Sequence, residues 1–71
     1  MTNAVRPGQV WRHHKGHAYF VVAIGKHSET LEDVVVYRRT DDKQVWVRPL
    51  AMWKEEVHHE GRVQQRFARI K

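Results

Sequence analysis

The residues best suited to chemistry in this chain stand together in the segment HSETLED, residues 27–33, between two apolar runs. His27, Ser28 and Glu29 supply an imidazole, a hydroxyl and a carboxylate, the three groups that nucleophilic enzymes combine. Such an enzyme also needs the base within hydrogen-bond reach of the hydroxyl, and consecutive residues of an extended segment point apart. An enzyme acting on a small substrate through His27 and Glu29 is therefore the least favoured reading of the segment.

Two other readings fit the same segment. In the first reading, the side chain of Ser28 or Thr30 caps the turn, and the carboxylates of Glu29, Glu32 and Asp33 accept hydrogen bonds from backbone donors. A ligand-binding loop would instead present its first three residues, His27 to Glu29, to a bound molecule. We expect capping at the Thr30 and Asp33 end and ligand binding at the His27 end.

Arg48 is the second candidate group, because it ends an apolar strand and shares a strand face with Trp46. A guanidinium held over an aromatic surface suits a phosphate, a carboxylate or a stacked base. The alternative is an internal ion pair with Glu29 or Glu32, which would explain both motifs without a ligand. The two alternatives stay open at the level of the sequence.

Six histidines raise the question of a metal site. His14 and His17 would face one another across a hairpin turn, and His58 or His59 could add the third imidazole that a catalytic zinc site needs. Exposed turns also tolerate histidine, and the adjacent His58 and His59 would point to opposite faces of a strand. We expect no metal site and no cofactor.

The bulk composition describes a small soluble domain. A chain of 71 residues is one domain, 1–71, whose first seven residues we expect to be flexible, and it buries only about 60% of the surface that its unfolded chain exposes. There is no cysteine, which excludes disulfides and thiolate zinc clusters. No apolar run has the length of a signal peptide or a membrane span, so we expect a cytoplasmic protein that does not enter the membrane.

The charge is clearly positive. Lys and Arg total 13 against 8 for Asp and Glu, which gives a formal net charge of +5. A field of this sign raises the rate of encounter with polyanions and weakens with added salt. The basic residues are spread along the chain rather than gathered in a run, so the charge is only a weak indication of nucleic-acid binding.

Short apolar segments bounded by turn signals predict a mainly β structure. Residues 17–25, HAYFVVAIG, are aromatic or β-branched for most of their length and indicate the central strand. The expected strands are 8–14, 17–25, 33–39, 44–49, 56–59 and 62–70, with a short helical turn after Pro49. This order predicts an all-β, SH3-like antiparallel barrel of five to six strands with one helical turn before the last strands.

The alternation along the strands assigns side chains to faces. We expect Val45 and Val47 in the core, with Trp46 and Arg48 pointing outward or into a groove. A thin core cannot hold every large aromatic ring of this chain. The rings that the core cannot all hold are Trp11, Tyr37 and Trp46, and they are interleaved with Arg12, Arg38 and Arg48.

The order of these motifs resembles a family of small bacterial proteins, domain of unknown function 1653. The shared pieces are RHHKG with Tyr19 following, HSETLEDVVVY, WVRPLAMW with EEV after it, and Gly61 with RF. The resemblance runs from Gly8 to Phe67 and implies an SH3-type barrel, without implying a reaction, substrate or cofactor. This chain departs from the family pattern at His14, where the family has tyrosine, and at Trp53, where it has phenylalanine.

We therefore expect a small binding module that contacts RNA or single-stranded nucleic acid. Bases would stack on Trp11, Tyr37 or Trp46, while arginines 12, 38 and 48 meet phosphates. The alternative is a module that binds an extended peptide or a partner protein in an aromatic groove.

Overall fold

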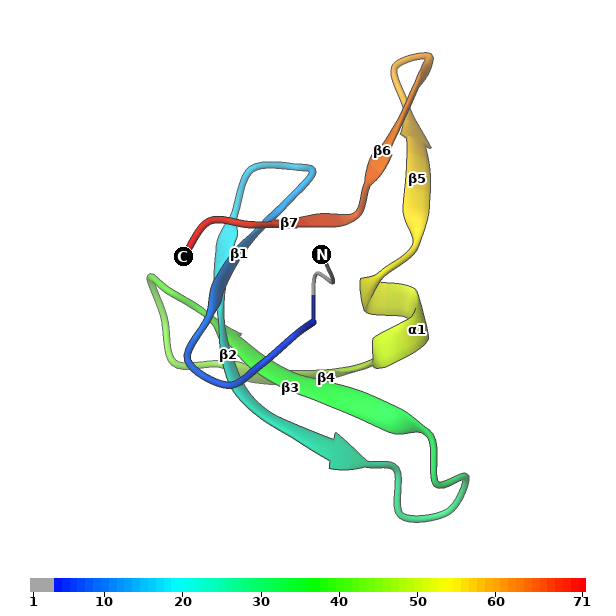
Figure 1. Ribbon diagram of the computed structural model, residues 1–71. Coiled ribbons are helices and arrows are strands. Elements are labelled where there is room, and N and C mark those ends of the chain that lie inside the picture. The colour runs from blue at the N-terminus through cyan, green and yellow to red at the C-terminus, as the bar shows by residue number, and fades with distance from the viewer. Residues whose placement is uncertain (1–3) are drawn as a thin grey trace.

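The structure, a computed structural model, describes residues 4–71. It is mainly β, as predicted, with seven strands and one helical turn (Figure 1). The elements are β1 (Val10–His13), β2 (Ala18–Lys26), β3 (Asp33–Arg39), β4 (Val45–Pro49), α1 (Leu50–Trp53), β5 (Glu56–His59), β6 (Arg62–Gln65) and β7 (Phe67–Arg69).

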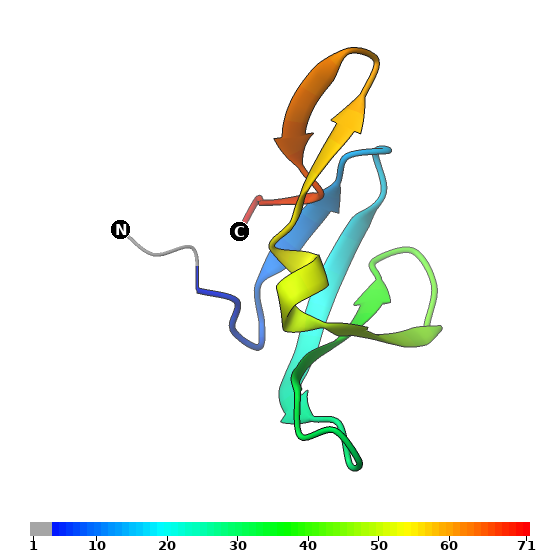
Figure 2. The same ribbon diagram turned by 90° about the vertical axis from the view of Figure 1, so that its right-hand side faces the viewer.

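Five strands form one antiparallel sheet in the order β4-β3-β2-β1-β7, and β2 lies at its centre as the sequence predicts. Strands β4 and β7 are the two edges, so hydrogen bonding does not close this sheet into a barrel. The sheet curls, and α1 covers part of its inner side (Figure 1). Strands β5 and β6 form a separate hairpin that projects away from the main sheet (Figure 2).

Strand pairing assigns each side chain to the inner or the outer face of the curled sheet, because directly opposed residues share a face. The inner face carries the buried side chains Trp11, Val21, Val35 and Tyr37. The outer face carries their neighbours in sequence, among them Arg12, Phe20, Val36 and Arg38.

The register corrects the prediction for β4. Val47 pairs with Val36 and Val45 with Arg38, so both valines lie on the outer face, 61% and 47% exposed. They are not core residues. The pairing of Trp46 with Tyr37 puts the tryptophan on the inner face, where it remains half exposed because β4 is an edge strand.

The core is built from aromatic rings, with Trp53 at its centre. Trp53 is 1% exposed and stacks on Phe67, with the ring centroids 3.8 Å apart and the planes within 4°. Trp11 and Tyr37 meet the Trp53 ring edge-on. The single turn of α1 follows Pro49, which cannot continue the β ladder as a donor, and it carries Trp53 over the inner face.

The predicted last strand, 62–70, is divided at Arg66 into β6 and β7. The backbone N–H of Arg66 donates to the Glu55 carbonyl, and the Arg66 carbonyl accepts from His14. These bonds turn the chain from the hairpin back onto β1, where Phe67 pairs with His13.

Gln9 organises the segment before β1. Its buried side-chain amide accepts hydrogen bonds from the Arg6 backbone N–H and from the indole N–H of Trp11, both at 2.9 Å, and donates to the Ala4 carbonyl. Val5 packs against the core. Of the segment 1–7 that we expected to be flexible, residues 1–3 lie outside the described residues, and residues 4–6 are held by these contacts.

Candidate functional site

The His27–Asp33 segment is the loop between β2 and β3, and several of its polar groups form hydrogen bonds within the loop. His27 Nδ1 accepts hydrogen bonds from the backbone N–H groups of Glu29 and Thr30, at 3.1 and 3.2 Å. The His27 backbone closes the loop at both ends, accepting from Leu31 and donating to the Glu32 carbonyl. His27 therefore has a structural role that the sequence did not reveal.

At the far end of the loop, capping is confirmed for Thr30 but not for Asp33, which among the described residues accepts no backbone hydrogen bond through its side chain. Thr30 Oγ1 accepts from the Glu32 backbone N–H and donates to the Glu32 carboxylate. Asp33 forms an exposed ion pair with Lys26 at 2.7 Å, of the kind that contributes little to stability. Leu31 adopts a left-handed backbone conformation, with φ 64°, that the tight turn requires.

The loop does not assemble a catalytic array. His27 Nδ1 is occupied by backbone donors, and within residues 4–71 no hydrogen bond joins Ser28 to His27 or to Glu29. All three side chains are exposed. A nucleophile–base pair needs the direct contact that these residues do not make.

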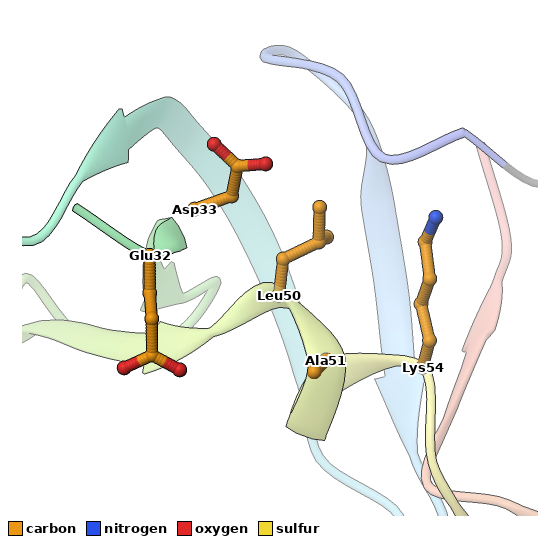
Figure 3. A pocket seen from close by; sticks show the side chains of 5 residues that line it. All are labelled: Glu32, Asp33, Leu50, Ala51 and Lys54. Carbon is orange, nitrogen blue, oxygen red and sulfur yellow. The ribbon is translucent and has the colours of Figure 1, made fainter. Parts of the chain in front are cut away.

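A shallow depression of about 380 Å³ lies where this loop meets α1. Its lining is Glu32, Asp33, Leu50, Ala51 and Lys54. The two carboxylates point in opposite directions and the Lys54 ammonium stands apart from both (Figure 3). The depression therefore offers no convergent set of polar groups to a ligand.

Arg48 sits in a different setting. It is partly buried on the inner face, its Nε donates to the Tyr37 hydroxyl at 3.3 Å, and its guanidinium carbon lies 5.6 Å from the Phe67 ring centroid. The internal ion pair considered from the sequence is absent: among the described residues, Arg48 has no salt bridge to Glu29 or Glu32. Its charge is held by an aromatic face and a hydroxyl, which leaves guanidinium N–H groups for a ligand.

Arg48 belongs to a group of side chains that we call the inner patch. Trp46 lies two residues before it on the same face of β4, and His13 reaches Phe67 from the other side, with ring centroids 5.0 Å apart. The inner patch comprises His13, Tyr37, Trp46, Arg48 and Phe67. It combines a half-exposed indole, a cation that has no carboxylate partner among residues 4–71, and an imidazole that packs on the Phe67 ring.

The pKa of His13 responds both to burial and to the cations around the inner patch. Burial, and after it the nearby charges of His14, Arg48, Arg66 and Lys15, together lower the pKa of His13 from 6.5 to about 4. Each of these neighbours disfavours a second positive charge at the imidazole. His13 is therefore neutral at pH 7, within a positive field that favours an anion.

Other predicted site residues lie either in the core or on the outer face of the sheet. Trp11 and Tyr37 are 4% and 5% exposed, so the core holds both rings, and of the three candidate stacking rings only Trp46 has an exposed face. Arg38 stacks over Phe20 on the outer face, 5.0 Å from the ring centroid, and Arg12 lies on that face as well. Of the predicted aromatic and arginine surface, the structure places Trp46 and Arg48 on the same face of β4, where the Tyr37 hydroxyl accepts a hydrogen bond from Arg48.

His13 and Phe67 belong to the inner patch and were missed by the sequence analysis. Each has a signal in the sequence, since both fall in motifs quoted above, RHHKG and RF. Alternation within single strands could not join them to Arg48, because the contact runs from β1 to β7 and from β7 to β4.

Within residues 4–71, no group of three or more histidine, aspartate or glutamate side chains is arranged to hold a metal ion. His14 lies against His59, with ring centroids 5.2 Å apart, rather than against His17. In the part of the chain that the structure describes, the one helix is far too short to cross a bilayer.

Comparison with known proteins identifies the family. A family model described as a protein of unknown function, DUF1653, matches residues 9–69. Among solved structures, the chain is similar to a DUF1653 protein from Bordetella bronchiseptica, at 36% sequence identity and a TM-score of 0.82, covering 99% of this chain and 92% of that one. No curated protein matches the chain. Since the family model spans most of the sequence and the likeness extends to the whole fold, this chain belongs to the DUF1653 family.

Proposed function

We propose that this protein is a small binding module, with an SH3-like arrangement of strands, that holds RNA or single-stranded nucleic acid on its inner patch. The observation that carries the proposal is Arg48, a partly buried cation over an aromatic ring with no carboxylate partner among the described residues. Trp46 beside it has an indole that is half exposed. Stacking and phosphate contact from adjacent side chains are what sequence-tolerant binding of a single strand requires.

The positive charge of the protein favours an anionic ligand such as RNA over a neutral one. The net charge of +5 favours encounter with a polyanion, and His13 lies in a field set by several cations. At neutral pH the uncharged imidazole can still donate or accept a hydrogen bond. Trp46 would carry a base, Arg48 a phosphate, and His13 a base edge or a sugar hydroxyl.

The test uses the intrinsic fluorescence of the protein. Trp11 and Trp53 are buried, so quenching by a short oligouridylate reports mainly on Trp46. We expect salt-dependent quenching, with Trp46→Ala weakening the affinity about tenfold, from a stacking contribution of about 1–3 kcal/mol per base. Affinities of the tryptophan variant are measured by anisotropy of a labelled oligonucleotide. Absence of binding at low salt would remove the proposal.

Arg48 is tested by its salt dependence. Arg48→Gln removes one phosphate contact and should lower the slope of log affinity against log salt by about 0.7, whereas Arg48→Lys should retain that slope. Lys54→Gln is the matched control, because it changes the net charge equally at the α1 end of the fold. An equal effect of the two glutamine variants would mean that net charge alone governs binding.

A second candidate function, binding of an extended peptide, is supported by the exposed edge of the sheet. Val45, Trp46 and Val47 are consecutive residues of the edge strand β4, and all three are about half exposed or more. An uncharged, apolar edge can take a further strand from a partner. Binding of that kind would be insensitive to salt and would be weakened by Val47→Lys, while oligonucleotide binding would not.

A further inference from the structure

The outer face of the five-stranded sheet carries apolar side chains where a solvated sheet face is usually polar. Val36 pairs with Val47 across β3 and β4, and Val45 lies two residues from Val47 on the same face. Val45 and Val47 are 47% and 61% exposed, and Val36 is partly buried. We call these three residues the outer valines. Contiguous exposed apolar groups of this kind are typical of a surface that binds a partner.

The described chain covers only the inner side of its sheet. The helical turn α1 packs on β3 and β4 from the inner side (Figure 1). The β5–β6 hairpin projects away from the sheet, and no helix or strand of residues 4–71 lies across the outer side (Figure 2). A sheet face with exposed valines is stabilised when a second layer packs on it.

Two arginines lie on the outer face, and within residues 4–71 neither forms an ion pair. The guanidinium carbon of Arg38 lies 5.0 Å from the centroid of the Phe20 ring, and Arg12 makes one 3.4 Å contact to a backbone carbonyl. The five strands of the sheet contain a single carboxylate, Asp33, and alternation along β3 places it on the inner face. The strands therefore offer cations and valines on the outer face, with no negative charge.

This combination of groups fits an acidic and apolar segment of another protein. Partner carboxylates would meet the two unpaired arginines, and partner aliphatic side chains would pack on the outer valines. A second copy of this chain fits less well, because it has the same net charge of +5 and the same two arginines. The face is therefore complementary to an acidic partner and not to itself.

Nucleic acid and lipid also match this face less well. A single nucleic-acid strand needs open ring faces, and the aromatic ring on the outer face, Phe20, has the Arg38 guanidinium over it. Insertion into a membrane surface uses large side chains such as Trp, Phe and Leu on an amphipathic helix, whereas the outer valines are short and lie along a sheet. A flat valine surface is suited to close packing with another protein element.

We propose that the outer face binds an acidic amphipathic helix of a partner protein, whose apolar side packs on the outer valines and whose flanking carboxylates bind Arg12 and Arg38. A helix can present an apolar stripe between two charged flanks, and helices pack as layers on open sheet faces. This interaction goes beyond the proposed function and does not depend on it, because the inner patch lies on the opposite face. Both faces can be occupied at once.

The test uses a synthetic helical peptide with leucines along one side and glutamates on both flanks. It should shift the methyl resonances of Val36, Val45 and Val47, while those of the buried Val21 and Val35 stay in place. Two control peptides should not bind: one with lysines in place of the glutamates, and one with the same composition in scrambled order. Equal binding of the lysine peptide would overturn the role of the arginines.

Variants of the protein test the charged and the apolar part separately. Arg38→Glu should weaken binding of the glutamate peptide about tenfold, because it places like charges opposite each other. Arg62→Glu is the matched control, since it makes the same change of charge on the exposed strand β6, and it should stay within about twofold of the wild type. Val36→Thr exchanges a methyl group for a hydroxyl and should weaken binding about fourfold.

Val36 lies on β3, inside the sheet, so a loss of affinity in Val36→Thr also separates this surface from strand addition at the β4 edge. Circular dichroism shows whether each variant is folded. Wild-type affinity in both Val36→Thr and Arg38→Glu would remove the outer face as the site. A dimer in sedimentation equilibrium that Val36→Thr weakens would assign the face to a second copy of the chain and overturn the proposal.

Two further measurements distinguish this inference from other ligands. Binding to vesicles of anionic phospholipid, without binding of the glutamate peptide, would assign the face to a membrane and overturn the proposal. Trp46→Ala should lower the affinity for oligouridylate and leave that for the peptide unchanged, whereas Val36→Thr should do the reverse. Absence of oligouridylate binding would remove the proposed function and leave the outer face as a protein-binding surface.

Discussion

The β2–β3 loop and the inner patch are both polar regions, and they differ in where their hydrogen bonds go. In the loop, His27 and Thr30 direct their side chains to neighbouring backbone groups. In the inner patch, the Arg48 guanidinium has a hydroxyl and a ring face as partners and retains free N–H groups. The reactive residue types of the loop thus serve its own turn, whereas the unused hydrogen-bonding capacity of Arg48 is the reason why we propose the inner patch as the binding site.

The floor beneath the inner patch depends on Trp53. We expect Trp53→Ala to lower the free energy of unfolding by about 3–5 kcal/mol, because it leaves a cavity among Trp11, Tyr37 and Phe67. Urea denaturation followed by circular dichroism measures this. Trp53→Phe should cost far less, since the indole N–H of Trp53 has no partner to lose among the described residues. A loss below 1 kcal/mol for the alanine variant would show that the patch does not rest on this ring.

The pH dependence of stability distinguishes the inner patch from the loop. The pKa of His13 is lowered to about 4 in the folded protein. As pH falls through 6.5, His13 therefore binds a proton in the unfolded chain but not yet in the folded protein. The free energy of unfolding should therefore fall between pH 7.5 and about 4. The pKa of His14 is also lowered, mainly by desolvation, and adds in the same direction. The measurement is urea denaturation across this range of pH.

His13→Gln should flatten this pH profile and His58→Gln, an exposed change on the β5–β6 hairpin, should not. Anion binding should also strengthen as pH falls towards 4, where His13 begins to take up a proton and a bound phosphate favours its charged imidazole. Parallel profiles for the wild-type protein and His13→Gln would contradict the buried setting of this imidazole.

The structural role of His27 predicts a modest effect on stability alone. His27→Ala removes the acceptor for two backbone N–H groups and should cost about 1 kcal/mol in unfolding free energy. His27→Asn keeps a side-chain acceptor near the same N–H groups and should recover most of that loss. Neither variant should alter oligonucleotide affinity measured by anisotropy, and a loss of binding in both would restore the loop as a ligand site.

Among these variants, substitution of Glu29 should change the stability and the oligonucleotide affinity least. Its carboxylate is exposed, and Glu29→Gln removes one negative charge without breaking a side-chain hydrogen bond of the loop. We expect the unfolding free energy to change by less than about 0.5 kcal/mol, and the affinity for oligouridylate to change no more than the added net charge explains. A decrease in affinity, measured by anisotropy, would mean that the carboxylate touches the ligand.

Strand positions were predictable because turn residues and apolar runs are local signals. The bounds predicted for β3 agree with the structure at both ends, and the hairpin turn occurs at Lys15 and Gly16, where Gly16 has a φ of 112°. Arg66 was not predictable as a break, because the bonds that turn the chain there come from Glu55 and His14, far away in sequence.

Side-chain placement was harder to predict, since alternation gives two faces without saying which is buried. Val45 and Val47 have the residue type of a core and lie outside, because β4 is an edge strand whose inner face turns Trp46 and Arg48 towards the core. Trp11 was one of the candidate stacking rings and lies inside, because it packs with Trp53 and Phe67 in the core. These outcomes depend on which strands end up at the edges, and no single segment encodes that.

The buried amide of Gln9 has a practical consequence for anyone who shortens or fuses this chain. It joins Ala4 and Arg6 to the indole of Trp11, so the residues before the first strand act as a wedge that closes one end of the core. Trimming that removes Ala4 to Arg6 would strip Gln9 of two of its bonds and uncover the core where Val5 packs. Affinity tags and fluorescent labels therefore belong before Ala4 or at the C-terminus, with the wedge left intact.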